Sequence, residues 1–147
     1  MTGGRTFAEV TLERTACYGS CPIYKIVVKG DGTVTYDGER FVKLTGHHAG
    51  TLPPERLAEL AAAFDKAGYF RFEDAYTAYN VTDHPSAVTS YKDAARSKRI
   101  DHYHGDRSAP RELTALEDEI DRVVGTDRWI GTEKEREALT ARGWPAR

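Results

Sequence analysis

Two cysteines are the first residues in this sequence that could perform covalent chemistry. Cys17 and Cys21 enclose a Tyr-Gly-Ser spacer, and Pro22 follows them. If they face each other across two antiparallel strands, their Cα atoms lie about 4.5–5.5 Å apart, and a disulfide accepts about 4.4–6.8 Å. Three roles are open: a structural pair (bonded, or packed as thiols), a redox pair, or half of a metal site. The sequence favours the structural role, because a thioredoxin-type pair needs Cys-x-x-Cys at a helix N-terminus and a zinc ribbon needs a second cysteine pair.

Histidines are the next candidates. His102 and His104 stand two residues apart on an expected strand, so their side chains share one face. With the two thiolates they could form a tetrahedral zinc or copper site. Nothing in the sequence brings these distant elements together, so we predict no metal and no cofactor, and an exposed polar strand face. His47 and His48 are expected in a loop.

Aromatic residues gather between residues 69 and 79, and an acidic residue follows them. Asp83, near Tyr76 and Tyr79, could act as a general base or anchor a ligand. It could equally cap the turn before Pro85, because Asp accepts backbone N–H bonds there. The aromatic residues could line a groove for a peptide or glycan, or plug the end of a sheet. The candidate binding residues are Tyr18, Tyr24, Tyr76, Tyr79, Asp83, His102 and His104.

Composition narrows the function classes. The net charge is −2 and the pI is about 6.2, which predicts no nucleic-acid partner. No apolar run approaches the roughly 20 residues of a membrane span. The sequence contains no Gly-x-Ser-x-Gly, His-Glu-x-x-His or phosphate-binding glycine loop. The catalytic residues are therefore unknown, and enzymatic activity is not favoured.

The elements that must position these residues begin with strands. Residues 7–14 alternate apolar and polar side chains, as a half-buried strand does. Residues 23–29 form a second strand with Tyr24, Ile26 and Val28 facing the core. Gly-Asp-Gly and Asp-Gly turns then predict a third strand around Val34 and Tyr36, and a fourth over residues 40–44. Together they form an antiparallel meander.

Helical spacing starts after the two prolines. Leu57, Leu60 and Phe64 predict a helix over residues 54–67, ended by Gly68. A hairpin follows over residues 86–92 and 97–103. A second helix begins near residues 108–109 and ends at Gly125. Its apolar stripe is Leu113, Leu116, Ile120, Val123 and Val124, and Glu117, Asp118 and Asp121 are expected to face water.

A capping box formed by Thr132 and Glu135 predicts a short third helix that ends near residue 143. Trp129, Leu139 and Trp144 are expected to anchor it. The sequence therefore predicts one α+β domain over residues 1–147, with an antiparallel sheet of about four to six strands. Two main helices pack on one face, and a short C-terminal helix belongs to an extension over residues 126–147.

The cysteine turn and the Gly-Asp-Gly hairpin over residues 12–38 together resemble an uncharacterised bacterial family, domain of unknown function 6438. The resemblance covers about residues 7–125, and it implies a fold but no activity. Related domains often look exported or attached to lipoprotein leaders. This N-terminus lacks a signal-peptide pattern, so we expect a cytoplasmic location, or an exported one if a leader was trimmed.

Function remains a choice between two classes. The leading hypothesis is a non-enzymatic binding or interaction module for an unknown small ligand or protein, with a concave, tyrosine-bearing sheet face as the contact surface. The alternative is a small redox or metal-binding protein that acts through the Cys17/Cys21 turn. The sequence specifies no oligomeric state.

Overall fold

A computed structural model of the chain describes residues 7–17, 19–78 and 84–141. Seven strands form one sheet in the order β4-β3-β2-β1-β6-β7-β5. Their bounds are β1 Glu9–Arg14, β2 Ile23–Lys29, β3 Thr33–Arg40, β4 Gly46–Thr51, β5 Ala75–Tyr76, β6 Ser86–Lys92 and β7 Ser97–Tyr103. Every neighbouring pair is antiparallel except β5 and β7. The α+β class is confirmed, with one strand more than expected, because two-residue β5 is too short to show a sequence period.

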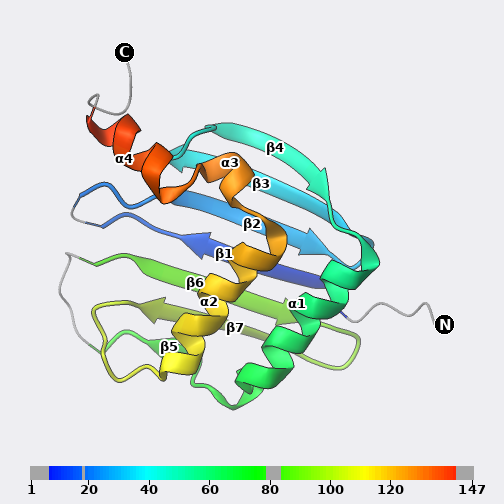
Figure 1. Cartoon of the computed structure of the whole chain (residues 1–147). Coiled ribbons are helices and arrows are strands. Elements are labelled where there is room, and N and C mark those ends of the chain that lie inside the picture. The colour runs from blue at the N-terminus through cyan, green and yellow to red at the C-terminus, as the bar shows by residue number, and fades with distance from the viewer. Residues whose placement is uncertain (1–6, 18, 79–83, 142–147) are drawn as a thin grey trace.

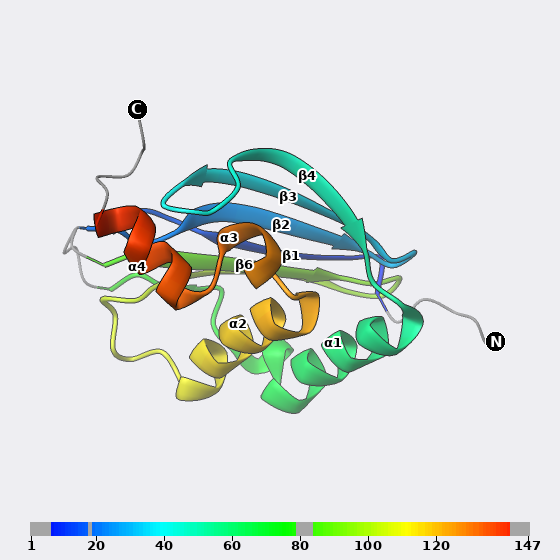
Figure 2. The same cartoon turned by 45° about the horizontal axis from the view of Figure 1, so that its top comes forward.

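Two long helices, α1 (Pro54–Ala67) and α2 (Arg111–Val124), lie side by side on one face of the sheet (Figures 1 and 2). The described residues also form a 3-10 turn, η1 (Tyr69–Arg71), and two short helices, α3 (Asp127–Ile130) and α4 (Glu133–Ala141). None of the helices in this described part is long and apolar enough to cross a membrane. The two-layer arrangement follows from the spacing of apolar residues in the sequence. Each long helix has an apolar stripe and the sheet has one apolar face, and the two surfaces pack together.

The core lies between these layers. Tyr24, Ile26 and Val28 of β2 are buried, as their alternation predicts. Helix α1 contributes Leu57, Leu60 and Phe64. Each long helix carries a proline beside its first turn and ends at a glycine with positive φ, Gly68 or Gly125, a conformation that glycine adopts without strain.

The fourth strand was predicted in the wrong place. The meander β1 to β4 exists, but β3 extends to Arg40 and β4 begins only at Gly46. Phe41 has a φ of 57°, which interrupts an extended strand. The backbone N–H groups of Lys43 and Leu44 then donate to carbonyls at the end of α3 instead of to a neighbouring strand. Consequently His47 and His48 lie in β4 and not in a loop.

The C-terminal prediction is confirmed in part. Thr132 and Glu135 exchange both hydrogen bonds of a capping box at the start of α4. Trp129 is buried and its ring stacks on Tyr36, with centroids 5.2 Å apart. Leu139 is half-buried, and Trp144 lies outside the described residues. Helix α3, which carries Trp129, was not predicted, because four residues show too little periodicity.

Candidate functional site

Four strand ends meet at one end of the sheet. β1 and β7 end there, and β2 and β6 begin there, because antiparallel pairing sets Arg14 opposite Tyr24 and Ser86 opposite Tyr103. Residues from α2, α3 and α4 close the same end and leave a cleft of about 280 Å³. The cleft is lined by Arg14, Thr15, Cys21, Pro22, Tyr24, Pro85, Ser86, His104, Asp118, Asp121, Asp127, Ile130 and Arg136. Three of the sequence candidates, Cys21, Tyr24 and His104, therefore share one site.

One wall of the cleft is a charged network around Asp121. The Arg14 guanidinium donates to the Asp121 carboxylate over 3.0 and 2.9 Å. The Tyr24 hydroxyl donates to the same carboxylate over 2.7 Å and accepts from Arg14. Burial raises the pKa of Tyr24 and the Asp121 charge raises it further, so this hydroxyl stays protonated at neutral pH. Asp121 was expected to face water, and that expectation is wrong, because Arg14 and Tyr24 offset the desolvation of its carboxylate.

Asp118 behaves differently from its neighbour. It also reaches Arg14, over 3.3 Å, but its side chain is 75% exposed. The prediction that Asp118 faces water is therefore confirmed. Its carboxylate can therefore accept further hydrogen bonds at the edge of the cleft, since one long hydrogen bond uses few of its lone pairs.

His102, His104 and Glu117 form a triad next to the cleft, which His104 lines. His102 Nδ1 is 2.6 Å from one oxygen of Glu117, and His104 Nε2 is 2.8 Å from the other. The side chains of Glu117 and His102 are 0% and 4% exposed, and that of His104 is 25% exposed. Burial would raise the pKa of Glu117, but hydrogen bonds from both imidazoles outweigh it and hold the pKa below its usual value. An ionised carboxylate only accepts hydrogen bonds, so each facing ring nitrogen is a donor.

These contacts correct two expectations. His102 and His104 do share one face, but that face is covered by α2 and is not an exposed polar surface. Glu117 was expected in water and is fully buried. A signal for it was present, since residue 117 follows Leu113 by four and precedes Ile120 by three, inside the apolar stripe. A charged residue within the apolar stripe of a helix indicates that a polar or charged partner is buried beside it.

The cysteines form a disulfide at the rim of the cleft. Cys17 and Cys21 are bonded, with their Cα atoms 5.7 Å apart, within the range that the sequence allowed. Both sulfurs are therefore used, and neither is a thiolate that could bind a metal. The turn leads into a strand, β2, and not into a helix, so the pair does not stand at the start of a following helix as a thioredoxin pair does.

Of the remaining candidates that the structure describes, Tyr76 and His102 do not line the cleft. Tyr76 is buried, its hydroxyl accepts the backbone N–H of Glu73, and its ring lies 6.2 Å from that of His102. Tyr18, Tyr79 and Asp83 lie outside the described residues. The tyrosine-bearing face that was expected to contact a partner is covered, because Tyr24, Tyr36 and Tyr91 all belong to the buried core under the helices.

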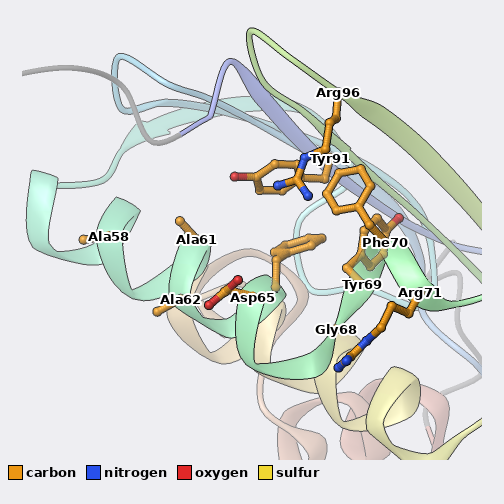
Figure 3. A pocket seen from close by; sticks show the side chains of 11 residues that line it. Ala58, Ala61, Ala62, Asp65, Gly68, Tyr69, Phe70, Arg71, Tyr91 and Arg96 are labelled. Atoms are coloured by element: carbon orange, nitrogen blue, oxygen red, sulfur yellow. The ribbon is translucent and has the colours of Figure 1, made fainter.

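The aromatic cluster lies elsewhere, beside α1. A hollow of about 670 Å³ has Phe70, Tyr91 and Arg96 in its wall (Figure 3). The Arg96 guanidinium stacks 3.8 Å above the Phe70 ring, and the Tyr69 hydroxyl hydrogen-bonds to Thr89. Edge-to-face contacts join Phe70 to Tyr69 and to Tyr91. Part of this aromatic surface is thus used in packing, while Phe70 and Tyr91 also line the hollow.

No curated protein matches the chain. The sequence model of one family, described as domain of unknown function 6438, matches residues 8–124. That segment contains the disulfide turn, both long helices and the His102–His104–Glu117 triad, and it stops before α3. The match covers most of the chain, and the chain therefore belongs to the family of domain of unknown function 6438.

Proposed function

We propose that this domain is a non-enzymatic binding module and that the cleft at the strand ends is its binding site. The observation that carries the proposal is the convergence of fixed charged groups on one hollow. Arg14, Tyr24 and Asp121 hold one another in place, and His104 is held from behind by buried Glu117. Side chains locked in this way lose little freedom when a ligand arrives, which favours binding.

The charges of the cleft indicate the class of ligand. Three carboxylates line it, those of Asp118, Asp121 and Asp127, against two guanidiniums, those of Arg14 and Arg136. Glu117 adds a further negative charge beneath His104. Arg14 is already paired with Asp121, and Arg136 donates to the Gly131 carbonyl. With Arg14 and Asp121 paired, Asp118 and Asp127 are left against Arg136, so the cleft keeps an excess of negative charge and favours a positively charged group.

The proposal is tested by nuclear magnetic resonance titration of the labelled protein with arginine amide, and separately with sodium acetate. We expect saturable shifts at the amides of Thr15, Ser86, His104 and Asp118 with arginine amide, and none with acetate. Asp118→Asn should weaken binding of arginine amide. Asp65→Asn, an exposed acidic residue of α1, is the matched control and should not. Shifts spread over the whole surface, or equal for both probes, would refute the proposal.

The redox alternative acts at the rim of the same cleft, and a second variant separates it. A Cys17→Ser, Cys21→Ser protein has no thiol chemistry. A binding module keeps its affinity for arginine amide within a few-fold in this variant. A loss of binding in the variant, reproduced by reduction of the unmodified protein, would instead favour a function that depends on the redox state of the pair.

A further inference from the structure

We propose that His102, His104 and Glu117 form a binding site for one divalent transition-metal ion of the zinc class, at the inner end of the cleft. One potential ligand atom from each residue lies within 4.8 Å of the others. The inference deepens the proposed function and rests on it, because it names the positively charged ligand that the cleft admits.

The donor set fits such an ion. Two imidazole nitrogens and one carboxylate oxygen are ligands that zinc takes in proteins with an open fourth position. Imidazole favours zinc, copper, nickel and iron, whereas magnesium and calcium favour sets of oxygens. The disulfide leaves Cys17 and Cys21 out of the set, so the site differs from the thiolate site that the sequence left open.

The distances also fit. A tetrahedral zinc ion at about 2.0–2.2 Å from each donor separates two donors by about 3.4 Å. The contacts of Glu117 with His102 and His104 are 2.6 and 2.8 Å. These two contacts use different oxygens of Glu117. For the facing nitrogens to bind an ion, each imidazole would carry its proton on its other ring nitrogen, and each contact would widen by less than about 1 Å. All three ligand atoms lie within 4.8 Å of one another, so the widest pair would close by up to about 1.4 Å to reach the tetrahedral separation, a change that side-chain rotation can supply.

The surroundings supply access and support. His104 lines the cleft, and its side chain is 25% exposed, so an ion can reach the triad from solvent. Behind it, the Tyr76 ring lies against His102. The Asp106 carboxylate is fixed by Ser108 and by the Ala78 N–H, and it interacts electrostatically with His102.

The elements that hold the triad favour a pre-formed site. Two donors come from or directly follow β7, and the third comes from the middle of α2. A strand places residues i and i+2 on one face, and the packing of α2 on the sheet fixes the distance to the third donor. Sites on such rigid elements keep their geometry better than sites on loops.

The test uses the whole untagged chain, stripped with chelator and titrated calorimetrically with zinc chloride, then with magnesium chloride. We expect one zinc per chain, a rise in melting temperature with zinc, and no binding of magnesium. His104→Gln should weaken zinc binding by at least about 10–100-fold, since loss of a supporting residue alone costs that much. His47→Gln, an exposed histidine of β4, is the matched control and should not change the affinity.

His104→Gln is the main variant because His104 is the most exposed of the three and its loss threatens folding least. The histidine ring signals of His102 should also shift on addition of zinc. No zinc binding, binding unchanged in His104→Gln, or binding lost in His47→Gln would each overturn the inference.

The failure of this inference is distinguishable from that of the proposed function. Asp118→Asn should lose affinity for arginine amide and keep the triad's zinc site. Binding of arginine amide without zinc would refute the metal site and leave the binding cleft standing. If neither arginine amide nor zinc binds, both the binding cleft and the metal site are refuted.

Discussion

Helices α1 and α2 have equal length and similar ends, but they bury different kinds of side chain. Each has 14 residues, a proline beside its first turn and a C-terminal glycine with positive φ. Helix α1 buries only apolar side chains, whereas α2 buries Glu117 among its apolar residues and half-buries Asp121. Each of these two carboxylates is held by partners on the sheet. The difference indicates that α1 contributes packing, while α2 also builds the site.

The largest effect should come from adding a carboxylate to α2 where no partner exists. Ile120 is fully buried, three residues after Glu117. Ile120→Asp should leave little folded protein, because an unpaired buried charge is far costlier than the hydrogen-bonded one at Glu117. The measurements are soluble yield and thermal melting by circular dichroism. Asp118→Ala, at an exposed position, is the control, and a normal melting curve for Ile120→Asp would contradict the assignment of α2's buried face.

The next effect concerns α1 and its apolar role. Phe64 is buried against the rings of Tyr69 and Tyr91, at centroid distances of 4.8 and 5.0 Å. Phe64→Ala should lower the free energy of unfolding by about 3–5 kcal/mol through the cavity it leaves. Urea denaturation measures the change, with Lys66→Ala on the exposed side as control. An unchanged midpoint would show that α1 does not pack in this register.

A smaller effect should reveal the polar link between α2 and the sheet. Tyr24→Phe removes the hydroxyl that donates to Asp121, and we expect a loss of about 1.5–3 kcal/mol, as for hydrogen bonds to charged groups. Tyr36→Phe is the matched change, since its hydroxyl donates to the neutral Leu44 carbonyl, and it should cost about 0.5–1.5 kcal/mol. Equal losses by denaturation would mean that the charge on Asp121 contributes nothing to this link.

The same comparison explains what the sequence could predict. The bounds of α1, β2, β6 and β7 followed from periodicity, because each element faces the core along its whole length. The position of β4 did not, since Phe41 interrupts the strand with a positive φ and the next N–H groups, of Lys43 and Leu44, donate to carbonyls of α3, far along the chain.

The site was predictable only in fragments. Cys21, Tyr24 and His104 were candidates, but their meeting depends on the register of four strands. Glu117 and Asp121 were placed in water because charged residues usually are. Only the partners on β1, β2 and β7 offset their desolvation, and helical periodicity does not identify partners on other elements.

A modest effect should also come from loss of the disulfide at the rim of the cleft. The bond between Cys17 and Cys21 closes a short loop, so the chain-entropy stabilisation is about 2 kcal/mol or less. Pro22 and the glycine-containing spacer already favour the turn, and strand pairing from Arg14 to Tyr24 holds its two ends together. Cys17→Ser with Cys21→Ser should therefore fold, with a small drop in the urea midpoint. Reductant should produce the same drop in the unmodified protein and none in the double variant. A loss well above 2 kcal/mol, or a double variant that does not fold, would show that the wall formed by Arg14, Tyr24 and Asp121 depends on the covalent bond.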